Sequence, residues 1–173
     1  MSSPESSPLP DRDALDLLRA FAAREVRYLL VGAHAHAYYG PPRATADLDL
    51  FIEPSPENAA RIAMALADFG LPTGELDLTL LAVPGALLQM GEPPWRIDLN
   101  TELTGITFAE GWEGHPTVRL ADVDVPVIAW EALVKNKRAT GRPKDLLDLA
   151  LLGVPVGAAS DLEVDSADPS LQG

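Results

Sequence analysis

The sequence predicts an α/β protein of the α+β kind, in which helices flank a small mixed, mostly antiparallel sheet. Short apolar runs and amphipathic segments follow one another irregularly, which argues against the regular alternation of a doubly wound parallel sheet. The chain has 173 residues, 47% of them hydrophobic, which is enough for the core of a single domain. We expect this domain over residues 11–153, between a Ser/Pro-rich disordered tail (1–10) and an acidic flexible tail (154–173).

The N-terminal half should contain three helices and two strands. An aspartate cap and an apolar stripe predict a helix over residues 11–24, and an apolar run predicts a buried strand over 26–31. A glycine ends that strand, and a short helix over 33–39 stops at a Gly-Pro-Pro sequence. A second strand is expected over 46–52. A Ser-Pro pair then starts a helix that runs over 55–69, up to a glycine.

The C-terminal half should begin with strands and end with two helices. Segments 76–83 and 86–90 look strand-like on either side of a Pro-Gly break, and 96–100 resembles another strand. Residues 118–120 and 125–128 indicate a hairpin. The helices are expected over residues 130–139 and 143–152, separated by a glycine.

The overall charge is strongly acidic, with 13 basic residues against 26 acidic ones and a formal net charge of −13. This balance argues against broad nucleic-acid binding, which depends on neutralising many phosphates. All three lysines nevertheless fall between Lys135 and Lys144, together with Arg138 and Arg142. Such a cluster is either a solvated helix end or a pocket for the phosphates of a nucleotide.

Cysteine is absent, so disulfides and thiolate metal sites are excluded. No apolar run has the length of a membrane span, and the N-terminus lacks the basic and apolar regions of a signal peptide. We therefore expect a cytoplasmic protein that has no membrane partner.

Two aspartates, Asp47 and Asp49, lie one residue apart in an otherwise apolar strand. Residues i and i+2 of a strand point to the same face, so both carboxylates project together. The pair is either exposed on an edge strand or compensated by a cation. Mg²⁺ suits such oxygen ligands, with Mn²⁺ as the alternative, and Asp98 in a second strand-like segment would add a third carboxylate.

Three signatures occur in one order along the chain: VGAHAHAYYGPPRATADLDLFI, then RID, then NKRATGRPKD. In this order they resemble the DNA polymerase β-type nucleotidyltransferase superfamily, and in particular its small bacterial branch of toxin-like or uncharacterised domains. That branch follows the pattern of a glycine pair, H-G-x-x-R-x-T-x-D-x-D, R-I-D and N-K-x-A-x-G-R-x-K-D. The resemblance covers residues 26–152.

The resemblance implies a role for each matching residue. Carboxylates would bind the metal and take part in catalysis: Asp47, Asp49 and Asp98. Main-chain and side-chain groups would bind the nucleotide: Gly32, Ala33, Arg43, Thr45, Lys137 and Lys144. Lys137 is the leading candidate for a phosphate contact. For Lys144, a phosphate contact and a structural ion pair are equally expected.

The implied activity moves a nucleoside monophosphate from an NTP to a hydroxyl acceptor on an RNA end, a protein or a small molecule. Some relatives act in toxin–antitoxin pairs, which would imply a cognate antitoxin as partner. Ala33, where the branch has glycine or serine, and Tyr39, where it has histidine, support an alternative: a catalytically weak nucleotide-binding or interaction module. A two-metal nuclease or phosphatase would leave the glycine turn and the lysines unexplained.

Other polar and aromatic residues have simpler interpretations. His34 and His36 would lie on different faces of a helix, as packing or pocket-wall residues. Asp145 would cap or orient its helix, and Asp148 is expected at the surface. The tryptophans are expected to serve as core or lid aromatics: Trp95, Trp112 and Trp130.

Overall fold

The computed structural model describes residues 11–42, 44–92 and 96–157. Both predicted tails up to residue 10 and from 158, together with Arg43 and Trp95, lie outside the described residues. The described chain forms a mixed α+β fold around a four-stranded sheet in the order β1-β2-β4-β3. Only β2 and β4 run parallel, and the other pairs are antiparallel, as the sequence predicts.

Apart from two elements, η1 (Leu78–Ala82) and α4 (Phe108–Trp112), the strands and helices follow the expected order. The four strands of the main sheet are β1 (Tyr28–Leu30), β2 (Leu48–Ile52), β3 (Leu87–Met90) and β4 (Ile97–Asn100). A separate hairpin joins β5 (Thr117–Leu120) to β6 (Val123–Pro126). The helices are α1 (Arg12–Ala23), α2 (Gly32–Tyr39), α3 (Pro56–Phe69), α4 (Phe108–Trp112), α5 (Trp130–Thr140) and α6 (Pro143–Leu151).

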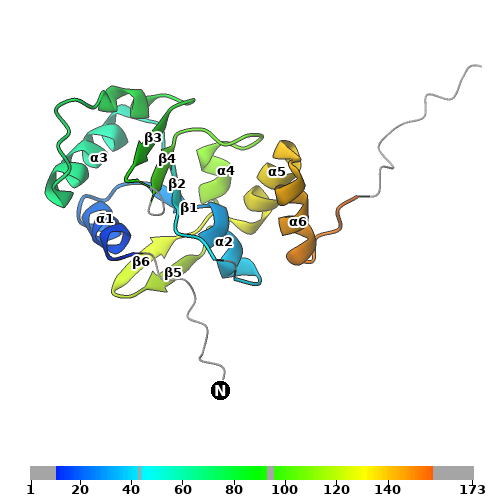
Figure 1. Cartoon of the computed structure of the whole chain (residues 1–173). Coiled ribbons are helices and arrows are strands. Elements are labelled where there is room, and N and C mark those ends of the chain that lie inside the picture. The colour runs from blue at the N-terminus through cyan, green and yellow to red at the C-terminus, as the bar shows by residue number, and fades with distance from the viewer. Residues whose placement is uncertain (1–10, 43, 93–95, 158–173) are drawn as a thin grey trace, which may run out of the picture.

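Helices lie on both sides of the main sheet (Figure 1). α1 and α3 pack against one another on one side, whereas α5 and α6 pair on the other. One face of β2 supplies Leu48, Leu50 and Ile52 to the core, and all three are fully buried. Because strand side chains alternate, Asp49 and Phe51 point to the opposite face. There Phe51 contacts Phe108 of α4 edge to face.

The N-terminus of α3 illustrates how local sequence sets a boundary. Ser55 accepts a hydrogen bond from the Asn58 main-chain N–H at 3.1 Å, and Pro56 occupies the first helical position. The buried Asn58 side chain also bonds to the main chain of Arg27 and Glu53. These bonds attach the start of α3 to the ends of β1 and β2.

Two elements differ from the expectations. The prediction of a strand over residues 76–83 is wrong: the segment contains a 3₁₀ helix, η1 (Leu78–Ala82), and Asp77 caps it by accepting a hydrogen bond from the Thr79 N–H. The spacing of its leucines resembles the alternation of a strand. The segment instead packs against α3 and buries only Leu81. α4 has no counterpart among the predicted elements, although Thr107 and Glu110 form a capping box that signals it.

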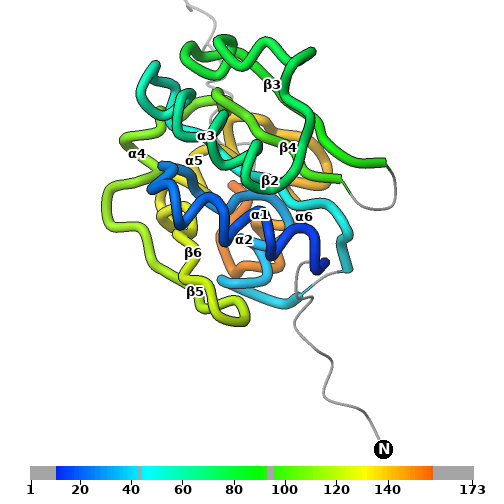
Figure 2. The backbone as a smooth tube through the Cα atoms, turned by 90° about the vertical axis from the view of Figure 1, so that its left-hand side faces the viewer, coloured from blue at the N-terminus to red at the C-terminus, as the bar shows by residue number. Residues whose placement is uncertain are grey.

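The two edge strands of the main sheet are β1 and β3. In a view turned by 90°, β3 lies far from α2 and the β5–β6 hairpin (Figure 2). The hairpin instead continues beside β1, where the Ile128 N–H donates to Leu30 O at 3.1 Å. None of the described helices has the length and apolar character needed to cross a membrane.

Candidate functional site

A cleft of about 550 Å³ lies between the sheet, the start of α2 and the turn that joins α5 to α6. Eight of the nine predicted site residues line it, and the ninth, Arg43, lies outside the described residues. The eight are Gly32, Ala33, Thr45, Asp47, Asp49, Asp98, Lys137 and Lys144. Residues from three separate signatures of the sequence are therefore brought to one place.

The acidic centre of the cleft comes from neighbouring parallel strands. Asp49 on β2 lies directly opposite Asp98 on β4, so both side chains point to the same face. Asp47 precedes β2 by one residue and is half-buried. Burial, and then the negative charges of Asp98 and Asp47, raise the pKa of Asp49 to about 6, although the charge of Lys144 opposes this rise.

The glycine turn is shaped around the Asp49 carboxylate. Gly32 begins α2 directly after β1 with a left-handed φ of 63°. A Cβ atom at this position would overlap Asp49 Oδ2, so both the backbone and the space require glycine. The Val31 N–H donates to Asp49 O at 3.0 Å and holds the turn against β2.

The start of α2 also supplies main-chain donors. Val31 at the N-cap position has no side-chain hydrogen bond to the first turn. The first N–H groups of a helix have no intrahelical partner and attract anions. Ala33 in this turn is buried and provides a main-chain N–H donor, but unlike serine it has no side-chain hydroxyl that could donate to an anion.

Thr45 organises the segment that leads into β2. Its Oγ1 accepts a hydrogen bond from the Asp47 N–H at 3.1 Å, closing a short turn that ends immediately before β2. The expected R-x-T element thus positions Asp47 through its threonine.

Two exposed cations line the cleft, Arg142, which is paired with Asp145, and Lys144. Lys144 lies in the first turn of α6, and its charge acts on Asp49. Within the described part of the chain, no carboxylate forms an ion pair with it. By contrast, Lys135 pairs with Glu110 at 2.5 Å, outside this cleft. Lys144 is therefore placed to contact an anionic ligand in the cleft.

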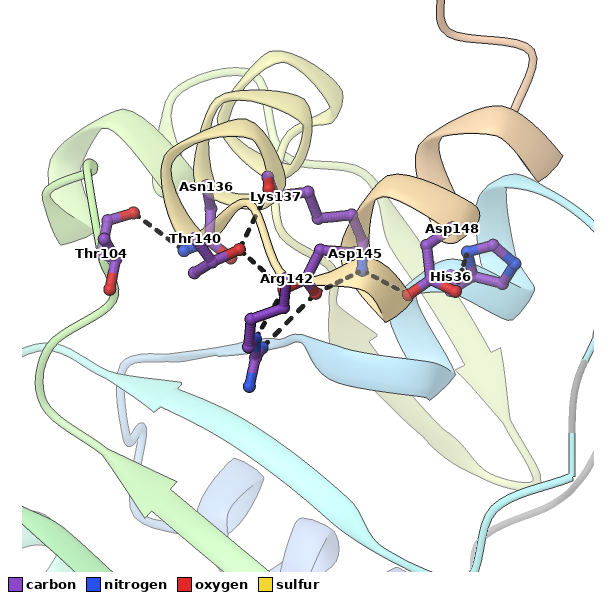
Figure 3. Close-up of polar contacts among 8 residues, drawn as sticks. All are labelled: His36, Thr104, Asn136, Lys137, Thr140, Arg142, Asp145 and Asp148. Carbon is purple, nitrogen blue, oxygen red and sulfur yellow. Dashed lines mark hydrogen bonds and ion pairs between the residues drawn. The ribbon is translucent and has the colours of Figure 1, made fainter. Parts of the chain in front are cut away.

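Lys137 occupies a different environment, inside a polar cluster between α5, α6 and α2 (Figure 3). Its side chain is 7% exposed, and its Nζ lies 2.8 Å from Asp148 Oδ2 and 3.9 Å from Asp145 Oδ1. His36 Nδ1 from α2 lies 4.0 Å from Asp148 Oδ1. Lys137 thus lines the cleft while its charge is compensated by two buried carboxylates.

Asp145 links this cluster to the rim of the cleft. It accepts hydrogen bonds from Thr140 Oγ1 at 2.8 Å and Arg142 Nε at 2.6 Å. Burial disfavours its ionised form, but the Arg142 and Thr140 hydrogen bonds and the charge of Lys137 together lower its pKa below the usual value. The expectation that Asp148 lies at the surface is wrong, because it is fully buried beside Lys137.

The donor set fits a divalent cation only in part. Over residues 11–42, 44–92 and 96–157, no group of three or more His, Asp or Glu side chains is arranged to hold a metal ion. Asp49 and Asp98 are nevertheless hard oxygen donors, and Asp98 Oδ1 is buried without a hydrogen bond, 3.6 Å from Arg96 Nε. Two carboxylates of this kind suit Mg²⁺ or Mn²⁺ when substrate phosphates complete the ligand shell.

Several residues were missed or have structural roles. Asn100 and Asn136 also line the cleft, and neither was predicted. Asn100 could have been found, since it lies two residues after Asp98 on the same strand face. His34 and His36 are both buried, and His36 belongs to the polar cluster through Asp148. Burial lowers the pKa of His34, although a backbone hydrogen bond at Asp47 opposes this.

Comparison with models of known protein families gives no match, and a search of curated proteins also gives none. The interpretation of the cleft therefore depends on its own residues and geometry.

Proposed function

We propose that this protein is a metal-dependent nucleotidyltransferase of the DNA polymerase β type, which moves a nucleoside monophosphate from an NTP to a hydroxyl acceptor. The observation that carries the proposal is the facing pair Asp49 and Asp98, set against the glycine turn of α2 and the free cation of Lys144. A negative pair, a helix N-terminus and a cation around one cleft suit a triphosphate and its metal.

In the proposed reaction, the acceptor hydroxyl oxygen attacks the α-phosphorus, and a new oxygen–phosphorus bond forms. The bond from the α-phosphorus to the oxygen bridging the β-phosphate breaks, and pyrophosphate leaves with that electron pair. A divalent cation bound by the carboxylates would stabilise charge on the attacking and leaving oxygens.

Each residue of the cleft has a task in this scheme. Asp49, Asp98 and the adjacent Asp47 would hold the cation, and Asp98 accepts the hydroxyl proton as the new bond forms. The N–H groups at Gly32 and Ala33 would face the phosphates. Lys144 would neutralise the departing pyrophosphate. Lys137 has a positioning role here, because it fixes the α5–α6 turn through Asp145 and Asp148.

The decisive experiment is isothermal titration of the full chain with each NTP, with and without Mg²⁺. We expect at least one NTP to bind only when the metal is present. Asp49→Asn should remove this binding without unfolding the protein. Asp124→Asn is the matched control, since this exposed aspartate lies on the β5–β6 hairpin outside the cleft. Absence of binding for every NTP at millimolar concentration would refute the proposal.

One observation favours the second candidate, a nucleotide-binding module with weak catalysis. Ala33 provides a main-chain N–H in the first turn of α2 but no side-chain donor. Transfer that appears only in Ala33→Ser or Ala33→Gly, while the native chain binds NTP, would assign the protein to this class.

A further inference from the structure

The outer edge of β3 is open. β3 is the last strand of the sheet, at the end away from β1 (Figure 1). Thr101 N donates to Ala86 O at 3.0 Å, so the alternation of an antiparallel ladder directs the N–H and C=O groups of Leu87 and Gln89 outward. Within the described chain these groups have no partner. The strand LLQM also lacks the charge, proline or bulge that usually protects an edge.

An apolar hollow of about 320 Å³ adjoins this edge. Its walls come from η1 and from the start of β3. Leu80, Val83 and Leu87 around it are 55%, 52% and 54% exposed, which is unusual for side chains so close together. An extended chain along β3 would thus find main-chain partners and a place for an apolar side chain.

The hollow and the cleft lie next to each other along β3. Leu87 lines both of them. Register pairs Asp49 with Asp98 and Asp98 with Gln89, so one row on the cleft face leads from the two carboxylates to the open edge. A segment paired with the outer edge of β3 is therefore separated from Asp98 by β3 alone, a distance of two strand spacings or about 10 Å.

The charge around the edge selects the class of ligand. Between residues 71 and 106 the chain has five acidic side chains and one basic side chain, Arg96, which lies 3.6 Å from Asp98. Asp77 lines the hollow, and Glu102 lies beside Gly85 at its rim. This surface repels a polyanion such as RNA and attracts a cationic chain.

We infer that the hydroxyl acceptor is a polypeptide: an extended segment with apolar and basic residues that pairs with the edge of β3 and presents a Ser, Thr or Tyr hydroxyl to the cleft. The inference rests on the proposed nucleotidyl transfer and specifies its acceptor. The main chain of the segment supplies hydrogen bonds, its apolar side chain fills the hollow, and its basic residues face the acidic rim.

The test uses the full chain, Mg²⁺, radiolabelled NTP and four defined probes. The first is a synthetic peptide that alternates Leu and Lys around one Tyr, Ser or Thr. The others are the same peptide with Glu for Lys, the same peptide with N-methylated alternate amides, and a single-stranded RNA with a free 3′ hydroxyl. We expect label on the first peptide, at least about tenfold less on the N-methylated peptide, and less still on the Glu peptide and the RNA, since lost edge hydrogen bonds and like charges both weaken docking.

Hydrogen exchange provides a readout that does not depend on catalysis. The first peptide should slow exchange of the Leu87 and Gln89 amides, which point outward. Leu80→Asn should lower peptide labelling about tenfold or more, because burying a leucine is worth at least that much in affinity. Leu147→Asn is the matched control, since this α6 leucine is equally exposed at 59% and lines neither site.

The outcomes separate this inference from the proposed function. If no NTP binds, the proposed function fails. If NTP binds but the peptide leaves the two amides unprotected, or RNA is labelled in preference to peptide, only the acceptor inference is overturned. Protection of β3 in the protein alone, together with a dimeric mass, would show that a second copy occupies the edge and would also overturn it.

Discussion

Replacing Asp49 by asparagine should stabilise the metal-free protein at neutral pH. In the folded chain, burial and the charges of Asp98 and Asp47 raise the pKa of Asp49 from 3.8 to about 6. The folded protein therefore holds a proton at pH values where the unfolded chain has lost it. The stability of the protein therefore falls as the pH rises from about 4 to about 6. Above pH 6 the full free-energy cost of ionising the buried Asp49 is present.

The magnitude follows from the size of this shift. At about 1.4 kcal/mol for each pKa unit, the rise corresponds to a ceiling of about 3 kcal/mol. Partial exposure of Asp49 and its coupling to Asp98 reduce this figure, and we expect Asp49→Asn to gain about 1–2 kcal/mol at pH 7.5. For a domain of this size the gain corresponds to a melting temperature higher by about 3–6 °C.

The assay is thermal unfolding in EDTA at pH 7.5 and pH 4.5. The gain should be full at the higher pH and small at the lower one, where Asp49 is protonated in the folded protein. Asp145→Asn is the control of opposite sign, because the pKa of Asp145 is lowered. Its loss of stability should be present at pH 7.5 and diminish as the pH falls through the pKa of its carboxyl. A melting temperature of Asp49→Asn below the wild type at pH 7.5 would show a structural carboxylate and refute the reasoning.

Three further predictions concern the glycine turn and the two lysines. Gly32→Ala should lower both the melting temperature and NTP affinity, and it should cost more stability than Gly70→Ala, which also has a positive φ but no neighbour within 4 Å; equal losses would contradict the overlap. Lys144→Ala should weaken binding of NTP more than of nucleoside and flatten its salt dependence, whereas Arg138→Ala should not; equal effects would indicate a diffuse basic surface. Lys137→Met should cost about 3–5 kcal/mol in denaturant unfolding, because a buried carboxylate loses its cation, and a loss below about 1 kcal/mol would contradict a structural pair.

Much of the fold could be predicted because its signals are local. Ser55 and Pro56 fix the start of α3, and the alternation around Asp49 fixes which side chains of β2 share a face with the carboxylate. The prediction for residues 76–83 was wrong for a physical reason. A short leucine-rich run fits a strand and a 3₁₀ turn equally well, and packing against α3 selects the 3₁₀ turn.

The site was predicted less completely where burial depends on distant partners. Asp148 looks like a surface residue in the sequence, yet Lys137 and His36 from two other helices surround it. Its spacing from Asp145 and Leu149 does place all three on one helix face, and all three are buried. The sequence does not indicate that β3 is an edge strand. An edge depends on the absence of a further strand beside it, and that is set by the topology of the whole sheet.

The close approach of Gly32 to the Asp49 carboxylate has a consequence for how related chains can vary. While an aspartate occupies position 49, position 32 has no room for a side chain. A shorter residue at 49 would open that space, and the left-handed backbone would then admit asparagine as well as glycine. Homologous sequences should therefore change at these two positions together. A chain that carries a side chain at position 32 would have lost the carboxylate at position 49 first. The residue at position 32 would therefore distinguish relatives that keep the acidic pair from those that do not.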